Sequence, residues 1–264
     1  MIKPPDRKIT LVLGGGSARG LAHIGLLKVL DREKIPIDLI VGTSIGALVG
    51  ATYALGLDLA KTEKIALRTK WWHITDFVTS KIGLLKGNNL ANVINEAVEN
   101  KNFEDAKIPL AVVTTDIERG DRVVLTSGNL TDAIRASCSL PGIFVPIRIN
   151  DRLLVDGGLM ESVPVKAAQQ LGATFTIACD VGFCVKKEKI TNLFQMIFQS
   201  IQIAGNELNK LQAKPADITI MPKLPNDIDQ MAFDKAELII YKGEDAAEQA
   251  IPLIRNKLQE AGLI

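Results

Sequence analysis

Apolar residues in this chain alternate between short β-branched runs and longer stretches in which apolar positions recur every three or four residues. The short runs predict buried strands, and the longer spacing predicts helices with one apolar face. We expect strands at residues 8–13, 38–41, 110–116, 122–126, 147–150, 153–156, 174–180 and 217–221. We expect helices at residues 20–34, 44–55, 61–69, 90–100, 193–211 and 235–260, with Pro252 kinking or breaking the last one. Strands alternating with helices are typical of an α/β fold.

This pattern shows no boundary between domains. It contains no internal repeat, low-complexity tract or linker, so residues 1–264 are expected to form a single domain. Hydrophobic residues make up 47% of the chain and charged residues 23%, a balance that argues against intrinsic disorder. A chain of 264 residues can bury a core without disulfide or metal staples.

Two segments imitate membrane or export signals. Lys3, Arg7 and Lys8 precede a short apolar run, but that run is too short for a signal peptide. Residues 39–57 carry no charge and contain glycines at GxxxG spacing, as packed membrane helices do. Acidic residues flank this stretch on both sides, and it is rich in glycine. We therefore predict a buried strand, a turn and a buried helix there, rather than a membrane span.

Charge and cysteine content narrow the class of protein. The chain has 31 Lys and Arg against 30 Asp and Glu, and the net charge of +1 gives no reason to expect nucleic acid as a partner. Cys138, Cys179 and Cys184 are too few for a disulfide framework. We expect a cytoplasmic protein, either free or peripheral at a membrane. The sequence leaves the oligomeric state open.

A glycine-rich turn follows the first predicted strand. Residues 14–20 read GGGSARG, and a helix is predicted directly after them. Glycines at this position let main-chain N–H groups approach a ligand, and the helix N-terminus adds partial positive charge. Arg19 rules out a dinucleotide loop and Leu21 rules out a phosphate loop, because each occupies a position that such a loop reserves for glycine or lysine. A cation in the first helical turn opposes the helix dipole, so Arg19 is expected to meet an anionic group. The alternative is a structural turn with a solvated arginine.

A candidate nucleophile lies between the second predicted strand and its helix. Residues 42–46 read GTSIG, which matches the G-x-S-x-G nucleophile elbow in the strand–turn–helix setting that the motif requires. The flanking glycines relieve crowding around a sharp turn that exposes the hydroxyl of Ser44. The alternative is a buried serine that caps the helix.

The expected partner of a nucleophilic serine, a histidine, is scarce. An α/β-hydrolase triad needs a histidine late in the chain, but only His23 and His73 exist. We expect His23 to be a hydrogen-bonded packing residue and His73 to lie in a peripheral aromatic cluster. A base is still needed, and Asp156, which follows a predicted strand and precedes two glycines, is the best candidate. The alternative for Asp156 is a plain turn. An aspartate suits this role only where a dry pocket raises its basicity.

Together these segments resemble the patatin-like phospholipase family. Residues 14–25 (GGGSARGLAHIG) are similar to its glycine-rich opening, and residues 42–46 to its nucleophile elbow. The triplet at residues 156–158 (DGG) is similar to its aspartate motif, and residues 136–146 to the block before that aspartate. The resemblance covers residues 8–180, and the compact size suggests a bacterial member without appended domains. Residues 181–264 match no functional motif.

The resemblance implies a three-layer α/β/α sandwich with a mostly parallel central sheet. It also implies lipid acyl hydrolysis by a Ser44–Asp156 dyad, with no metal or cofactor. The N–H groups of Gly14, Gly15 and Gly16 would form the oxyanion hole, and Arg19 would assist at an anionic intermediate or a lipid phosphate.

Several questions stay open at this point. The expected partner is a lipid or ester substrate, with transient contact with a membrane surface. An acyl pocket is expected from residues 71–85 and the helix at 193–211, although ordinary core would explain the same apolar positions. The alternatives are an acyltransferase or thioesterase using the same dyad, and a lipid-binding regulatory protein without turnover.

Overall fold

The structure is a computed structural model that describes residues 9–182, 189–212 and 216–264. The basic residues of the signal-like N-terminus and Cys184 lie outside these ranges. The predictions made for them are therefore not addressed by the structure.

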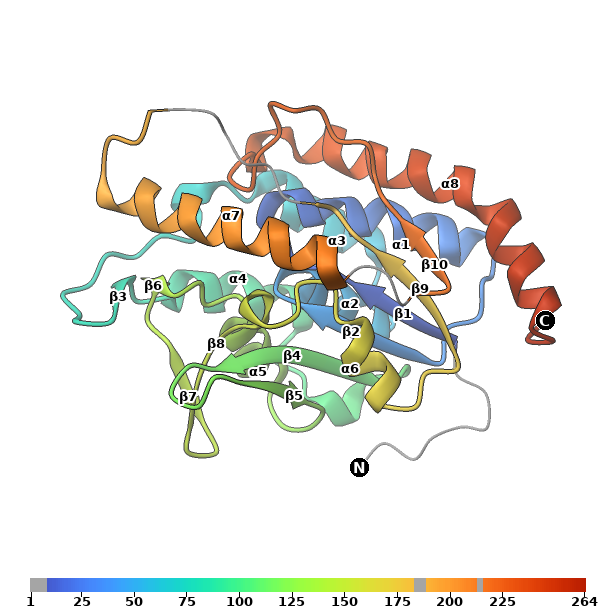
Figure 1. Ribbon diagram of the computed structural model, residues 1–264, viewed down its shortest axis with the longest axis horizontal. Helices are drawn as coiled ribbons and strands as arrows, with labels where there is room; N and C mark the ends of the chain where they lie inside the picture. The colour runs from blue at the N-terminus through green and yellow to red at the C-terminus, as the bar shows by residue number, and fades with distance from the viewer. Residues whose placement is uncertain (1–8, 183–188, 213–215) are drawn as a thin grey trace.

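A central eight-stranded sheet runs through the molecule (Figure 1). Its strands are β1 (Ile9–Leu13), β2 (Leu39–Thr43), β4 (Leu110–Asp116), β5 (Asp121–Leu125), β7 (Ile147–Ile149), β8 (Arg152–Asp156), β9 (Phe175–Cys179) and β10 (Ile218–Ile220). Strands β10, β9, β1, β2 and β4 are parallel neighbours in that order. Strands β5 and β8 both pair antiparallel with β4, and β7 pairs antiparallel with β8. The sheet is therefore mostly parallel, as predicted.

Helices cover both faces of this sheet. They are α1 (Ala22–Arg32), α2 (Ile45–Ala54), α3 (Leu59–Arg68), α4 (Asn88–Val98), α5 (Leu130–Ser137), α6 (Val165–Gln170), α7 (Leu193–Gln212) and α8 (Ala236–Glu260). Helices α1 and α8 lie side by side, and α7 crosses in front of the sheet in the view of Figure 1. This arrangement confirms the three-layer α/β/α architecture.

Alternate residues of the inner strands supply two separate cores. In β1, Leu11 and Leu13 belong to the larger core, which includes α1, α2 and α8. Val12 belongs to a smaller core, which includes α6. Because side chains alternate across a strand, a strand that is apolar at every position must be covered on both faces. The continuous apolar runs that predicted these strands reflect that double burial.

Several short elements escaped prediction. Two three-residue strands, β3 (Gly83–Leu85) and β6 (Gly142–Phe144), form a separate parallel pair. Helices α5 and α6 are also short, and a helix of two turns shows little periodicity. The described chain further contains 3₁₀ helices at Ser17–Leu21, Trp71–His73, Phe103–Asp105, Gly157–Leu159 and Phe233–Lys235.

Of the two effects expected of Pro252, a kink or a break in the last helix, the break does not occur. Helix α8 continues from Ala236 to Glu260 with Pro252 inside it. Buried residues lie on both sides of the proline, among them Ala247 and Ile254. Packing of these residues against the core holds both halves of the helix, which offsets the hydrogen bond that proline cannot make.

The uncharged stretch at residues 39–57 folds as predicted, into β2, a turn and α2. Within the described ranges, no helix combines the length and apolarity needed to cross a membrane.

Candidate active site

Ser44 lies at a sharp turn between β2 and α2. Its backbone has φ 54° and ψ −125°, a region that costs energy for any residue with a Cβ atom. The glycines on either side make the turn sterically feasible. A Cβ on Gly42 would lie 2.6 Å from the nitrogen of Ala47, and one on Gly46 would lie 2.2 Å from the carbonyl oxygen of Leu13. The Ser44 side chain makes no capping hydrogen bond to α2, so its hydroxyl is available for chemistry.

Ser137 of α5 holds the strained turn in place. The N–H of Ser44 donates to Ser137 Oγ at 2.7 Å, and that hydroxyl donates to the carbonyl oxygen of Val113 at 2.6 Å. The Ser137 hydroxyl thus provides hydrogen bonds to two buried main-chain groups, the N–H of Ser44 in the elbow and the carbonyl oxygen of Val113 in β4. The hydroxyl of Thr43 adds a bond to the carbonyl oxygen of Glu161 at 3.0 Å.

The sheet register brings Asp156 to Ser44. Strand β2 pairs with the first half of β4 and ends with Thr43 opposite Val113. Strand β8 pairs with the second half of β4 and ends with Asp156 opposite Thr114. Because β5 occupies the other edge of β4 along both halves, β2 and β8 must share one edge. They approach from opposite directions, so their carboxyl ends meet at neighbouring residues of β4.

Burial controls the chemistry of Asp156, whose side chain is 5% exposed. Its Oδ1 accepts the N–H of Gly158 at 2.7 Å. Desolvation raises the pKa of Asp156 to about 6, while hydrogen bonds from the Gly158 N–H and the Ser44 hydroxyl lower it in part. The carboxylate is therefore more basic than an ordinary aspartate, which is what a base for a serine hydroxyl requires.

The glycine-rich turn lies beside the nucleophile. A Cβ built on Gly15 would lie 3.5 Å from the Cβ of Ser44. However, the N–H of Gly14 donates to Cys179 O at 3.0 Å, and the N–H of Gly15 donates to Ser162 O at 2.9 Å. These bonds correct the expectation that both groups are oxyanion donors.

Two N–H groups of the turn are still candidates for that role. Among the described residues, no hydrogen-bond acceptor is found for the N–H of Gly16 or of Ser17. Both residues line the cleft that contains Ser44 and Asp156. Of the three residues expected to donate, only Gly16 thus has an N–H without a described acceptor, and Ser17 adds a candidate that was not expected.

Arg19 is directed away from the position expected for it. Its Nε donates to the carbonyl oxygens of Val181 at 2.9 Å and Gly182 at 3.2 Å, and its Nη1 donates to that of Ile228 at 2.6 Å. The side chain is 8% exposed and lines neither pocket at Ser44. Arg19 therefore ties the glycine-rich turn to two later segments, and these contacts do not support a role at a lipid phosphate.

Neither histidine reaches the site. His23 is fully buried, and its Nε2 lies 2.8 Å from the carbonyl oxygen of Gly14, to which it donates. Burial lowers the pKa of His23 to about 4, so the ring is neutral near pH 7. This is the predicted packing role. The Nδ1 of His73 accepts the N–H of Lys70 at 3.1 Å, and its ring meets that of Trp72 edge-on, outside both pockets.

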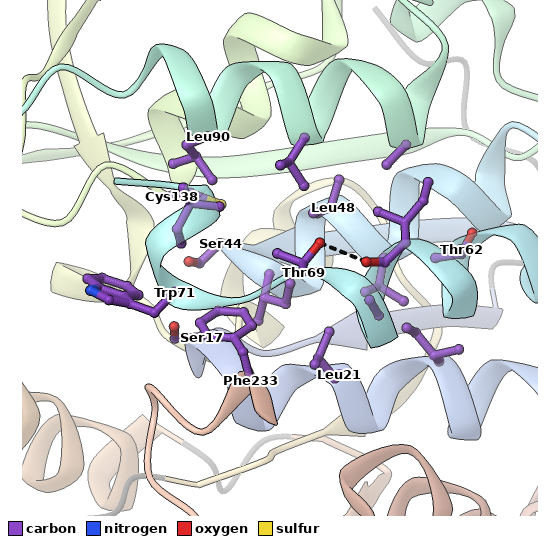
Figure 2. A pocket seen from close by; sticks show the side chains of 18 of the residues that line it. Ser17, Leu21, Ser44, Leu48, Thr62, Thr69, Trp71, Leu90, Cys138 and Phe233 are labelled. Carbon is purple, nitrogen blue, oxygen red and sulfur yellow. Dashed lines mark hydrogen bonds between the residues drawn. The ribbon is translucent and has the colours of Figure 1, made fainter. Parts of the chain in front are cut away.

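Two pockets meet at Ser44. The first, here called the apolar pocket, extends between α2, α3 and α4. Figure 2 shows Ser44, Ser17, Cys138 and Trp71 toward one end of it and Thr62 toward the other. The second, here called the dyad cleft, contains Ser44, Asp156 and the glycine-rich turn, and one face of α7 closes it. Ser44 therefore forms part of the wall of both.

The walls of the apolar pocket consist mostly of apolar side chains. Its walls include Leu21, Leu48, Ile65, Leu90 and Phe233, and Phe233 stacks on Trp71 with ring centroids 6.4 Å apart. The expected segment at residues 71–85 contributes Trp71 and Ile74 to this pocket, whereas α7 contributes to the dyad cleft instead.

Sequence reasoning missed several residues of the site. Cys138 lies beside Ser44 in the apolar pocket (Figure 2), and burial raises the pKa of its thiol far above the usual range, with a smaller contribution from the Asp156 charge. Gln202 and Gln230 line the dyad cleft. Cys138 lies within the block at residues 136–146 that carried part of the resemblance, whereas neither glutamine lies in a motif.

The fold and site define a class before any comparison is made. A serine at an elbow between a strand and a helix of a mostly parallel α/β sheet, with a buried aspartate beside it, is typical of serine acyl-transfer sites. The sequence model of the family described as "Patatin-like phospholipase" matches residues 11–168. This chain belongs to that family.

The relatives it matches are much longer proteins. The chain is 38% identical over 182 residues to patatin-like phospholipase domain-containing protein ZK370.4 of Caenorhabditis elegans, covering 66% of this chain and 14% of the relative. It is 36% identical over 180 residues to lysophospholipase NTE1 of Mycosarcoma maydis, covering 66% and 10%. It is 36% identical over 185 residues to human patatin-like phospholipase domain-containing protein 6, covering 66% and 13%.

Two solved structures share the fold. VipD from Legionella pneumophila superposes with a TM-score of 0.53 and 14% identity, covering 93% of this chain and 66% of VipD. The type III effector protein ExoU superposes with a TM-score of 0.54 and 14% identity, covering 95% of this chain and 54% of ExoU. At this identity the likeness concerns the fold alone.

Proposed function

We propose that this chain is a serine lipid acyl hydrolase, of phospholipase, lysophospholipase or esterase type, that uses a Ser44–Asp156 dyad. The observation that carries the proposal is the position of Ser44, which lines both the apolar pocket and the cleft that contains the buried Asp156. The names of the relatives, which include a lysophospholipase, support an ester substrate.

In the first half of the reaction, Ser44 Oγ attacks the ester carbonyl carbon while its proton passes to the Asp156 carboxylate. The tetrahedral intermediate carries a negative charge on the former carbonyl oxygen. When it collapses, the bond to the alcohol oxygen breaks and the Asp156 proton moves to that oxygen. The alcohol leaves, and the acyl group stays on Ser44.

In the second half, water takes the place of the alcohol. Asp156 accepts a proton from the water as the water oxygen attacks the acyl carbon. The second tetrahedral intermediate collapses, the bond to Ser44 Oγ breaks, and Asp156 returns the proton to that oxygen. The fatty acid leaves and the dyad is restored.

The N–H groups of Gly16 and Ser17 are the proposed oxyanion donors. Both line the cleft at Ser44, and neither donates to another described residue. Donors that are fixed before the reaction stabilise the developing charge without reorganising, and each is worth about 3–4 kcal/mol in comparable sites.

The test is hydrolysis by purified protein of a long-chain ester, beside the variants Ser44→Ala and Asp156→Asn. Ser44→Ala should abolish hydrolysis and labelling by a serine-reactive fluorophosphonate, since both need the same oxygen. Asp156→Asn should lower kcat by several orders of magnitude. Full activity in Ser44→Ala would overturn the nucleophile, and a loss below tenfold in Asp156→Asn would reduce the aspartate to a structural role.

An acyl-serine can also pass its acyl group to an acceptor other than water, or accept it from a thioester. Rates of transfer to alcohol and thiol acceptors, measured beside hydrolysis, separate an acyltransferase or thioesterase from a hydrolase. A regulatory lipid-binding protein would bind lipid with no turnover, but the buried, basic Asp156 next to Ser44 favours catalysis.

We also propose transient contact with a membrane surface through α7. Its exposed side, here called the outer face, carries Leu193, Met196 and Ile203, and other residues of the same helix, among them Gln202 and Leu208, line the dyad cleft. Spacings of three and seven residues place these three on one side of a helix. An apolar face at the mouth of the cleft would bring the site to its substrate.

A further inference from the structure

Two buried glutamines in the dyad cleft have side-chain atoms without a hydrogen-bond partner among the described residues. The side chain of Gln230 is 1% exposed, and neither its Oε1 nor its Nε2 has a partner among the described residues. Gln202 is 4% exposed, and its Oε1 is likewise unpaired within the described part of the chain. Buried polar atoms without partners are rare in folded proteins because each lowers stability. Two of them in one cleft point to a ligand.

The two side chains come from separate elements, and other contacts anchor each element. The carbonyl oxygen of Gln230 accepts the N–H of Ala18 at 3.0 Å, which fixes this residue against the glycine-rich turn. Gln202 belongs to α7, where Asn209 Nδ2 donates to Asp180 Oδ2 at 2.7 Å and attaches the helix near the end of β9. Contacts of neighbouring atoms thus hold both residues at the wall of the cleft, and three of their four side-chain polar atoms have no partner among the described residues.

The side-chain carboxamides of Gln202 and Gln230 are suited to bind a hydroxyl group of a ligand. A carboxamide offers both donors and an acceptor, and an alcohol hydroxyl uses both. A phosphate only accepts, and it would also lie near Asp156, the one ionisable side chain among the described residues that line the cleft. Ser162 and Ser200 add further hydroxyls to the same walls. The cleft therefore suits a neutral alcohol better than an anion.

The apolar pocket, in contrast to the dyad cleft, has no unpaired hydroxyl among its described threonines. Its two threonines are already satisfied, since Thr69 donates to Ile65 O at 2.7 Å and Thr62 donates to Asp58 O at 3.4 Å. The first of these bonds is the dashed line in Figure 2. An ester bound with its carbonyl at Ser44 would place its acyl chain in this pocket and its alcohol in the dyad cleft.

We propose that Gln202 and Gln230 form a subsite for a neutral, hydroxyl-bearing alcohol, so that the preferred substrates are glycerol esters of the monoacylglycerol type rather than esters with an anionic headgroup. This inference rests on the proposed function, because it assigns the leaving-group side of the same reaction.

The kinetic test compares three esters of one acyl chain: a monoacylglycerol, a methyl ester and a lysophosphatidate. The wild-type kcat/KM for the monoacylglycerol should exceed the other two at least tenfold. Gln230→Leu should lower the ratio of monoacylglycerol to methyl ester rates about tenfold, and Gln202→Leu should lower it less, because fewer of its atoms are unpaired. The matched control Gln249→Leu removes an exposed amide of α8 that already bonds to Asp245, and it should leave the ratio unchanged.

A binding test separates this inference from the proposed function. Ser44→Ala is titrated calorimetrically with a 1-O-alkylglycerol, which has no ester to hydrolyse, and with the corresponding alkylglycerol phosphate. Tighter binding of the alkylglycerol, lost about tenfold when Gln230→Leu is added, supports the subsite even if no ester is turned over.

Two results would overturn the subsite. One is equal or better hydrolysis and binding of the phosphate-bearing ligands by proteins with both glutamines intact. The other is an equal loss on monoacylglycerol and methyl ester in Gln230→Leu with unchanged thermal unfolding, because a hydroxyl contact can affect only the substrate that has the hydroxyl.

Discussion

Asp156 shows how a single residue acquires unusual chemistry from its surroundings. At 5% exposure its charged form has lost most of its hydration, and the hydrogen bonds from Gly158 and Ser44 restore only part of it. The resulting basicity serves the proposed reaction, and the same burial carries a cost in stability. Two predictions follow from these opposite effects.

The pH dependence of hydrolysis should report the pKa of this carboxyl. Asp156 must be ionised to accept the proton of Ser44, and burial raises its pKa to about 6. We expect kcat/KM to be level above pH 7 and to fall about tenfold per pH unit below pH 6. Initial rates on a soluble ester between pH 4.5 and 8.5 measure this. A profile that stays level down to pH 5 would contradict an elevated pKa.

Replacement of the carboxyl should stabilise the fold while activity is lost. Because the pKa of Asp156 is higher in the folded than in the unfolded chain, ionised Asp156 opposes folding above pH 6, and the effect disappears toward pH 4. Asp156→Asn keeps the acceptor for Gly158 N–H and should gain about 1–3 kcal/mol at pH 8. Urea unfolding at pH 8 and pH 4.5 tests this, with the exposed Asp151→Asn as control. An equal gain at both pH values would refute the electrostatic cause.

The sequence identified residues only where a motif or a rare residue type drew attention to them. Ser44 and Asp156 stood in recognisable motifs, and the scarcity of histidine pointed to a base of another kind. Gln202 and Gln230 gave no such signal, because their significance lies in unpaired side-chain atoms and a shared cleft. The exact oxyanion donors were equally hidden, since the partners of Gly14 and Gly15 are carbonyls of distant segments.

Among the elements, β4 organises the site. It carries β2 and β8 on one edge, so the register of three strands determines that Ser44 and Asp156 meet. The hydrophobic pattern predicted each of these strands nearly to the residue. It could not predict their pairing, because apolar periodicity reports which face is buried and not which strand lies alongside. The family resemblance implied that Ser44 and Asp156 act together, but it gave no order for the strands that carry them.

The turn between β2 and α2 should depend on glycine for steric reasons. A Cβ on Gly46 would lie 2.2 Å from Leu13 O, where neither backbone segment can yield cheaply. Gly46→Ala should therefore lower the free energy of unfolding by about 2–4 kcal/mol, although alanine favours helices. Chemical denaturation measures the loss.

A matched control separates close packing from conformational preference. Gly120 has φ 71° and nothing within 4 Å of a built Cβ, so Gly120→Ala should cost only about 1 kcal/mol. Similar losses in the two variants would mean that the elbow relaxes around the added methyl group.

On the scale of the whole molecule, α7 both lines the dyad cleft and presents apolar side chains to the solvent. Leu193, Met196 and Ile203 are 67%, 52% and 50% exposed, and other residues of the same helix line the dyad cleft. The pattern of the helix was predicted, but it was interpreted as a wall for the acyl chain. The three-layer architecture was predicted correctly, and the single-domain assignment for residues 1–264 stays a prediction.

The outer face of α7 should mediate binding to lipid vesicles. Removing two of its apolar side chains, in Met196→Ser with Ile203→Ser, should weaken sedimentation with phosphatidylcholine vesicles about tenfold or more, because each buried side chain is worth on the order of 1 kcal/mol. Leu253→Ser on α8 is the control, since Leu253 is also 50% exposed but lines neither pocket. Equal weakening in both variants would show that the contact is not specific to α7.

The match to the family model ends at residue 168, before β9 and β10. Strand β9 pairs with β1 along its whole length, and β1 is apolar at four of its five positions and buried at all of them. A chain ending at residue 168 would expose the unpaired N–H and C=O groups of β1, one of the most hydrophobic strands of the protein. Such an edge recruits strands from other copies and leads to aggregation. The part of the chain after residue 168 therefore supplies β9, the strand that pairs with β1, and this pairing prevents strands of other molecules from adding to the sheet at that edge.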